Sequence, residues 1–353
     1  MKDLNTILRE SAQSGASDVY IVPGATIRMR VDAHLQNVTQ ERLMPDQSEA
    51  LLQGIYALTK TRPIERLLSQ GDDDFSFSLP GVGRFRCCAY MQRGSLAAVL
   101  RVVRFELPDP QRLGIPQSVM ELADTQSGMV LVTGPAGSGK STTLACLIDH
   151  INRERQGHII TLEDPIEYLH SHNGCIVSQR EMHSDSQGFA VALRAALRQA
   201  PDVIMLGEMR DYDTMATALT AAETGHLLFS SLHTLGAAKS IDRIVDVFPA
   251  NAQQQGRVQL GTVLRAVVSQ QLVPTLSGGL TPVFEVMRVT PAIANLIREG
   301  KTFQIDNAIA AGGAQGMMTM DQGLAQLVQA KVISRQTALD AAQNRETLER
   351  RLR

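Results

Sequence analysis

The residues best suited to chemistry lie between positions 134 and 142, where the sequence reads GPAGSGKST. The segment matches G-x-x-x-x-G-K-[ST], follows the apolar run MVLVT and precedes the helical pattern TTLACLIDHI. In that context glycines let backbone N–H groups point at a phosphate, and the helix start adds positive potential. A glycine-rich turn with an incidental lysine is disfavoured because strand, motif and helix are in register. We expect a triphosphate to be bound by Gly134, Pro135, Ala136, Gly137, Ser138, Gly139, Lys140, Ser141 and Thr142.

Within this loop the side chains have separate expected roles. Lys140 is expected to reach the β- and γ-phosphates, and Ser141 to ligate Mg²⁺. Thr142 is expected to touch the α-phosphate. The sequence thus predicts a nucleotide and Mg²⁺ as the bound groups.

Acidic residues follow two other apolar runs. Residues 203–208, VIMLGE, end in Glu208, and in a nucleotide-binding sheet a strand ends at the crevice beside the loop. A carboxylate there orders Mg²⁺ or polarises the attacking water. A second cluster, TLEDPIE, contains Glu163, but a solvated Asp-Pro turn would have the same pattern. Arg210 and Asp211 fit the start of a helix.

Two histidines flank one further apolar run. His226 precedes residues 227–232 and His233 follows them. One of them is placed to donate to a γ-phosphate, although a structural, hydrogen-bonded histidine is the commoner case. Metal binding is disfavoured because no carboxylate or thiol lies at ligand spacing.

The surrounding pattern predicts the elements that position these residues. Apolar runs at 129–133, 158–163, 203–208 and 227–232, separated by helical patterns, indicate a covered parallel sheet. The first hundred residues indicate a mixed α+β domain, with strands at 18–22, 27–31, 75–79, 83–91 and 96–105. The predicted organisation is an α+β domain at 1–106, a proline-rich linker at 107–118, an α/β core at 119–275 and a mostly helical region at 276–353.

Composition limits the function classes. The chain has 353 residues, a formal charge of −2 and 4% aromatic residues, which disfavours tracking of a nucleic-acid backbone. No pair among the 4 cysteines has C-x-x-C spacing. The N-terminal segment lacks the apolar core of a signal peptide, and no run is long enough to span a bilayer, so we expect no direct membrane insertion.

Together these segments resemble the secretion and pilus-motor ATPases of the RecA-like class. GPAGSGKST resembles the Walker A box of that family, TLEDPIEY its acidic box, DVIMLGE its Walker B box and TGHLLFSSLHT its His box. The resemblance implies an α/β fold, with a RecA-like, parallel-sheet P-loop ATPase core, a smaller PAS-like α+β N-terminal domain and a helical C-terminal region. It also implies ATP and Mg²⁺ as ligands.

Within the family the chain is most similar to the retraction branch, PilT. The segment PAIANLIRE resembles the C-terminal signature AIRNLIRE of that branch, with Ala294 where the signature has its first arginine. The stretch usually written REDPD is RQAPD here, so Gln199 and Ala200 replace charged residues.

The resemblance assigns roles that spacing does not. It makes Glu208 the Walker B carboxylate and Mg²⁺ neighbour, Glu163 a residue that helps activate water, and His233 a γ-phosphate contact supported by His226. The resemblance also implies that three arginines of the N-terminal domain are catalytic and reach the phosphates when the domains close. They are Arg84, Arg86 and Arg101.

The expected function is therefore that of a cytoplasmic, homohexameric ATPase acting at the inner face of the inner membrane. Its implied partners are a membrane platform protein and other pilus ATPases, and its implied work is pilus retraction. Alternatives are an accessory retraction motor and an assembly or type II secretion ATPase; the latter generally carries a longer N-terminal region and a four-cysteine zinc insertion. A DNA-handling RecA-like ATPase and a non-hydrolysing nucleotide-binding scaffold are less consistent with the motifs.

Overall fold

The computed structural model describes residues 2–59, 62–103 and 107–352. These residues form two compact units, the first comprising 1–106 with 165–169 and the second 107–164 with 170–353. Each unit has its own sheet and apolar core. None of the helices in the described ranges combines the length and apolar character needed to cross a bilayer.

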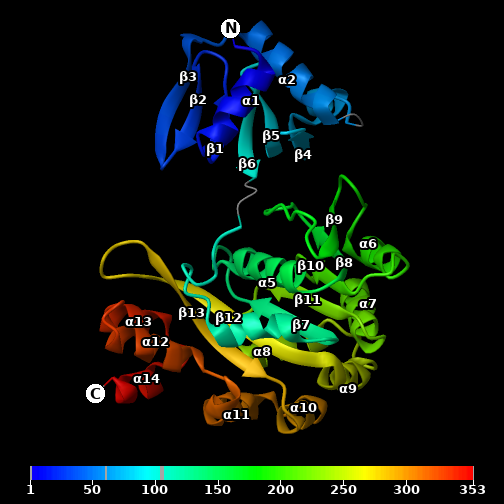
Figure 1. Cartoon of the computed structure of the whole chain (residues 1–353), viewed down its shortest axis with the longest axis vertical. Helices are drawn as coiled ribbons and strands as arrows, with labels where there is room; N and C mark the ends of the chain where they lie inside the picture. The colour runs from blue at the N-terminus through cyan, green and yellow to red at the C-terminus, as the bar shows by residue number, and fades with distance from the viewer. Residues whose placement is uncertain (1, 60–61, 104–106, 353) are drawn as a thin grey trace. The chain divides into compact units, whose positions relative to one another are not determined.

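The first unit is built on an antiparallel sheet with the strand order β3-β2-β1-β6-β5-β4. Its elements are α1 (Leu4–Gln13), β1 (Asp18–Ile21), β2 (Thr26–Val31), β3 (His34–Arg42), α2 (Pro45–Thr59), α3 (Glu65–Gln70), β4 (Asp72–Leu79), β5 (Gly83–Gln92) and β6 (Ser95–Val103). Alternate residues of β5, such as Phe85 and Cys87, are fully buried and share a core with Leu52 and Ile55 of α2. One face of the sheet therefore packs on helices, as Figure 1 shows for α1 and α2.

The predicted α+β character of this unit is confirmed, and so are its expected strands. Strand β3 was not predicted, because most of its side chains are exposed and its sequence, HLQNVTQER, lacks a clear apolar alternation. Phe105, placed in a strand by the sequence, lies outside the described residues.

The second unit contains a larger sheet in which six strands are parallel. Its strands are β7 (Gly128–Thr133), β8 (Gly157–Glu163), β9 (Cys175–Glu181), β10 (Val203–Leu206), β11 (Leu227–Leu232), β12 (Leu264–Pro274) and β13 (Leu280–Arg288). The order is β13-β12-β7-β11-β10-β8-β9, with only the edge strand β13 antiparallel to its neighbour. Every residue of β7, β10 and β11 is buried, which explains their continuous apolar sequences.

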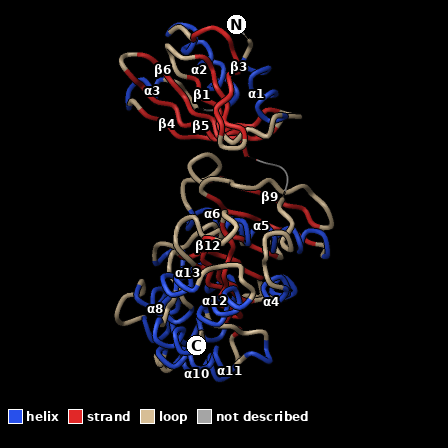
Figure 2. Tube along the Cα trace, turned by 90° about the vertical axis from the view of Figure 1, so that its left-hand side faces the viewer, coloured by secondary structure: helices blue, strands red, loops and turns tan. Residues whose placement is uncertain are grey.

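Helices cover both faces of this sheet (Figures 1 and 2). They are α4 (Gln117–Met120), α5 (Lys140–Glu154), α6 (Phe189–Ala196), α7 (Tyr212–Glu223), α8 (Ala237–Asp246), α9 (Gln253–Val263), α10 (Pro291–Arg298), α11 (Ile305–Ala311), α12 (Met320–Gln329), α13 (Arg335–Ala341) and α14 (Arg345–Arg351), with short 3₁₀ segments at Glu121–Asp124, Thr302–Gln304 and Gly313–Gln315. Helices α4 and α5 share one apolar layer with the strands, and α6 to α11 share the other. Helices α12 to α14 form a smaller core of their own with Val273 and Val283.

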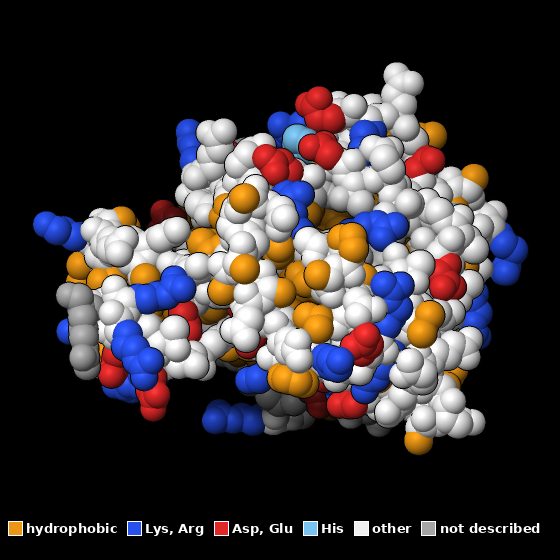
Figure 3. Space-filling view, turned by 90° about the horizontal axis from the view of Figure 1, so that it is seen from below, with side chains coloured by type: hydrophobic (Ala, Val, Ile, Leu, Met, Phe, Trp, Pro, Cys, Tyr) orange, Lys and Arg blue, Asp and Glu red, His pale blue; other side chains and the backbone are white. Residues whose placement is uncertain are grey.

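The structure confirms the α/β, RecA-like fold but changes the description of the region after residue 275. That region was predicted to be mostly helical, yet it begins with β13, which pairs along its length with β12. The sheet of the core therefore continues past the expected boundary. On the face shown in Figure 3, basic and acidic side chains are interspersed with apolar ones.

Candidate functional site

The loop between β7 and α5 has the shape of a phosphate-binding loop. Gly134, Gly137 and Gly139 have φ angles of 146°, 76° and 87°, a region that favours glycine. A Cβ atom on Gly134 would collide with the backbone oxygen of Gln270, and one on Gly139 would lie 2.9 Å from the Nε2 atom of the same glutamine. The loop is thus packed tightly on β12, and only glycine fits at these two places.

Polar groups of this loop fit an anionic ligand. Lys140 is only 7% exposed, and its Nζ atom donates to the carbonyl oxygens of Gly134 and Pro135, each at 2.9 Å. The buried Oγ atom of Ser138 has no hydrogen-bond partner among the described residues. Ser141 is exposed at the start of α5, where helix N–H groups attract negative charge. This donor set matches a polyphosphate, and Ser141 offers a hydroxyl ligand for Mg²⁺.

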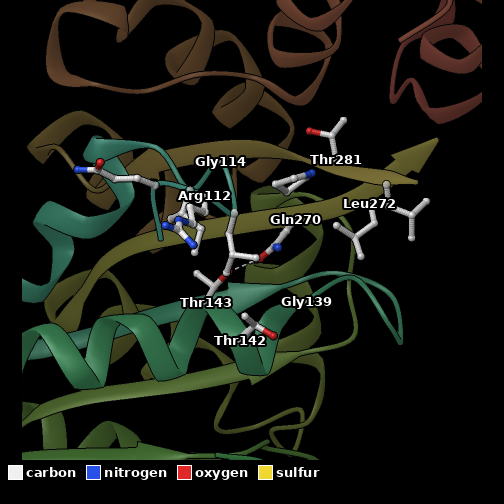
Figure 4. Close-up of a pocket in the computed structure, with 13 residues that line it drawn as sticks. Arg112, Gly114, Gly139, Thr142, Thr143, Gln270, Leu272 and Thr281 are labelled. Carbon is white, nitrogen blue, oxygen red and sulfur yellow. Dashed lines mark hydrogen bonds between the residues drawn. The ribbon is translucent and has the colours of Figure 1, made fainter. Parts of the chain in front are cut away.

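A cavity of about 410 Å³ opens beside the loop. It is lined by Gln111, Arg112, Leu113, Gly114, Ile115, Gly139, Thr142, Thr143, Gln270, Leu272, Leu280, Thr281 and Pro282. Figure 4 shows Thr143 of α5 next to Gln270 of β12, and the Oγ1 atom of Thr143 donates to the Oε1 atom of Gln270 at 2.7 Å. The volume lies in the range of small-molecule sites, so a nucleoside fits here in size. Residues 111–115 were predicted to belong to a linker, and their sequence did not indicate that they line this cavity.

Backbone hydrogen bonds bring the ends of the central strands to the same edge as the loop. The N–H of Gly134 donates to the carbonyl of Leu232 at 3.2 Å, and the N–H of Gly207 donates to that of Leu162 at 2.8 Å. The Oγ atom of Ser231 donates to the carbonyl of Gly207. The residues that directly follow Leu232, Gly207 and Leu162 are His233, Glu208 and Glu163. Three of the predicted site residues therefore lie along this carboxyl edge.

Glu208 and His233 are in contact. The Oε2 atom of Glu208 lies 3.3 Å from Nε2 of His233 and 2.8 Å from Nε of Arg210. The Glu208 side chain is 15% exposed, whereas those of His233 and Arg210 are 55% and 74% exposed. Arg210 was expected to be only a helix-start residue, and its ion pair with Glu208 is a contact that the sequence did not reveal. Asp211 caps α7 as expected, by accepting from the N–H of Thr214.

Glu163, the last residue of β8, is more enclosed. Its Oε1 atom accepts from Thr161 Oγ1 at 2.6 Å and from Gln179 Nε2 at 3.1 Å. It is 8% exposed. These two donors fix the position of the carboxylate.

Neither acid belongs to a self-contained metal centre. Within the described ranges no group of three or more His, Cys, Asp and Glu side chains is placed to hold a metal ion.

His226 lies at the opposite, amino edge of the sheet. It precedes β11, and its carbonyl accepts from the N–H of Gly128, where β7 begins. Its Nδ1 atom is 3.0 Å from the carbonyl of Ala221 and 3.1 Å from Oγ1 of Thr224. Since a six-residue strand spans roughly 20 Å, His226 lies at the edge opposite the phosphate-binding loop of its own chain, and its supporting role in nucleotide binding stays a prediction.

The three predicted arginines lie together in the first unit. Arg84 and Arg86 are two positions apart on β5, and Arg86 pairs directly with Arg101 of β6. All three therefore point to the sheet face opposite the buried Phe85. The Nε atom of Arg101 donates to Asp18 Oδ1 at 3.2 Å, and an Nη atom of Arg84 donates to Ser78. Directly opposed like charges destabilise a sheet, and the ion pair between Arg101 and Asp18 offsets part of this repulsion.

The sheet, the glycine-rich loop and the acids at the carboxyl edge define a RecA-like P-loop nucleotide-binding protein. The family described as Type II/IV secretion system protein matches residues 1–350, and this chain belongs to that family.

Individual relatives are similar over most of their length. The chain is 45% identical over 340 residues to the type IV pilus retractation ATPase PilT of Pseudomonas aeruginosa, covering 96% of this chain and 98% of that protein. It is 42% identical over 345 residues to a twitching motility protein of Neisseria gonorrhoeae, covering 97% and 91%. A crystal structure of the pilus retraction motor PilT with bound ADP matches with a TM-score of 0.89 at 43% identity, covering 99% of this chain and all of that one.

Proposed function

We propose that this protein is an ATP-hydrolysing motor that drives type IV pilus retraction. The observation that carries the proposal is the meeting of Glu208 and His233 at 3.3 Å on the sheet edge that also holds the phosphate-binding loop. Similarity to a pilus retraction ATPase, and to a pilus retraction motor solved with ADP, supports ATP as the nucleotide and pilus retraction as the process that it drives.

The residues of the site would divide the chemistry as follows. The loop N–H groups and Lys140 bind the β- and γ-phosphates, and the cavity beside Thr142 takes the nucleoside. Ser141 and Glu208 hold Mg²⁺, which when bound neutralises charge on the phosphate oxygens. Glu208 and Glu163 orient and polarise the attacking water, and His233 donates to the γ-phosphate.

The arginine face of the first unit would supply charge from outside the loop. Arginine stays protonated and binds phosphate oxygens in a bidentate manner. Arg84, Arg86 and Arg101 are therefore proposed to contact the triphosphate of a loaded site. Such contacts weaken when the γ-phosphate is lost, and this change would couple hydrolysis to domain movement.

The proposed setting is a cytoplasmic homohexamer attached to the pilus machine at the inner membrane. A platform protein of that membrane would receive the motion, and other pilus ATPases would share the machine. Nucleic acid is not proposed as a ligand, in keeping with a formal charge of −2.

Two experiments test the proposal. Purified protein with ATP and Mg²⁺ should release phosphate. If the oligomeric protein releases none, the proposed ATPase activity is refuted. Deletion of the gene in a piliated host should leave excess surface pili and abolish twitching. Cells without pili would instead indicate an assembly ATPase, and unchanged twitching would contradict a primary retraction role.

A further inference from the structure

A buried carboxyl group lies in β13, outside the set of residues assigned to the nucleotide. Glu285 is 1% exposed, and burial raises the pKa of its carboxyl group. Such a group is tolerated in a core only when it is hydrogen-bonded. Its Oε1 atom accepts from the backbone N–H of Ala237 at 2.8 Å, and its Oε2 atom lies 3.4 Å from the backbone nitrogen of Met320.

Glu285 helps to cap the start of α8. The N-cap residue of that helix is Gly236, which has a φ angle of 95° and no side chain to accept the first N–H groups. Ser269 of β12 accepts from the N–H of Gly236 at 2.9 Å, while Glu285 accepts from the next N–H, that of Ala237. Two side chains from the β12–β13 hairpin thus fix the turn at residues 234–237.

The same carboxyl group contacts the C-terminal helices. Met320 is the first residue of α12, and the side chain of Gln343, between α13 and α14, lies near enough to Glu285 to lower the pKa of its carboxyl group. The position of Gln343 is set by Asp321, which accepts from the N–H groups of Gln343 and Asn344 at 2.9 and 3.0 Å. One buried carboxyl group therefore joins the 234–237 turn to α12–α14.

The turn directly follows His233, the residue in contact with Glu208. We propose that Glu285 is a positioning residue for nucleotide hydrolysis: by holding the 234–237 turn, it keeps His233 against Glu208. The inference rests on the proposed hydrolytic function and adds a residue that positions one of its catalytic groups.

The test compares steady-state ATP hydrolysis by the full-length wild type, Glu285→Ala, Glu285→Gln and Asp321→Ala. Loss of the Ala237 contact should lower kcat about tenfold in Glu285→Ala while KM for ATP stays within about twofold, since the phosphate-binding loop is untouched. Glu285→Gln keeps an oxygen for Ala237 and should recover kcat to within about threefold of the wild type. Asp321→Ala is the matched control, because it loosens the α12–α14 docking without removing a contact to the turn.

Coupling to His233 separates positioning from a general loss of stability. If Glu285 acts through His233, then Glu285→Ala should lower kcat little further in a His233→Ala background. Fully additive losses, or equal losses in Glu285→Ala and Asp321→Ala, would overturn the positioning role. Amide hydrogen exchange of residues 234–240 should accelerate in Glu285→Ala but not in Asp321→Ala.

The outcomes also distinguish this inference from the function on which it rests. If the wild type releases no phosphate, the proposed function and the positioning role both fail. If the wild type is active and Glu208→Gln is not, but Glu285→Ala keeps its kcat, only the role of Glu285 is refuted.

Discussion

The two edges of the second unit's sheet are built from the same strands but hold different kinds of contacts. At the carboxyl edge, backbone hydrogen bonds lead from Gly134 to Leu232 and from Gly207 to Leu162, next to a histidine and two acids. At the amino edge a similar series leads from Gly128 to His226, from Leu227 to Asp202 and from Asp202 to His158. There the polar side chains mostly bond to backbone: His158 to the carbonyl of Gln199, and Asp202 to the N–H of His158.

The difference shows how strand direction selects a site. In a parallel sheet the carboxyl ends of all strands lie at the same edge, and ligands bind in the crevice formed by the loops that follow them. His226 and His233 flank the same strand, β11, yet of these two only His233 lies beside an acid and the phosphate-binding loop. Residue type alone does not separate these two histidines, whereas their edge of the sheet does.

The largest effect is expected at the carboxyl edge from Glu208→Gln. The amide keeps the size of the side chain but cannot act as a base or hold Mg²⁺ equally well, so phosphate release should fall about 100-fold or more. Binding of a fluorescent ATP analogue should change little. The control is Glu223→Gln at the end of α7, where the acid accepts from Gln259. Equal activity of the two variants would contradict the role of Glu208.

The second prediction tests the two histidines against each other. His233→Ala should lower kcat about tenfold through loss of the γ-phosphate donor and of the contact with Glu208. His226→Ala should leave kcat within about twofold, since its side chain hydrogen-bonds to Ala221 and Thr224, away from the phosphate-binding loop. Both are measured as phosphate release at saturating ATP. A larger decrease in kcat in His226→Ala than in His233→Ala would show that a residue at the amino edge contributes to catalysis.

A smaller effect is expected from Arg210→Ala. The guanidinium is mostly exposed, and exposed ion pairs contribute little, so a decrease in kcat of about threefold is expected from a less fixed Glu208. The decrease should diminish at high salt, which already screens the pair. Arg194→Ala is the control, because Arg194 pairs with Asp213 at 4.0 Å on the surface. A loss as large as that in Glu208→Gln would instead show that Arg210 contacts the nucleotide.

The smallest effect concerns stability in acid rather than activity. Because burial raises the pKa of Glu285 above its ordinary value of 4.5, the folded state holds this proton more tightly than the unfolded state. The free energy of unfolding should therefore decline, through this group, as pH rises from about 4.5 toward the folded-state pKa. Glu285→Gln lacks this contribution, so chemical denaturation of both proteins across that range measures it. A wild type that gains stability over Glu285→Gln as pH rises would contradict the assignment.

The sequence predicted those parts of the site that depend on local pattern. The loop at 134–142 and the strand at 227–232 were expected where they lie, since glycine spacing and uninterrupted apolar runs are local signals. Glu163 and Glu208 were identified because each follows an apolar strand. The roles of His233 and of the arginines needed the family resemblance.

The missing parts depend on contacts between distant residues. Strand β12 follows α9 without a connecting loop. Its sequence, LRAVVSQQLVP, mixes apolar and polar residues, so it shows neither the alternation typical of a strand nor the spacing typical of a helix. Glu285 occurs within VFEVM, and its partners Ala237 and Met320 lie 48 and 35 positions away. The ion pair between Arg210 and Glu208 depends on the backbone direction after β10. Tertiary packing, rather than local preference, determined the first two.

The β12–β13 hairpin has a practical consequence for dissecting the protein. A fragment ended near residue 275 would lack β13 and leave the 11 residues of β12 as an open edge strand. Unpaired N–H and C=O groups beside Ala266, Val267 and Val268 would then be free to recruit other chains into aggregates. Truncations intended to isolate the catalytic core should therefore retain residues through Arg288.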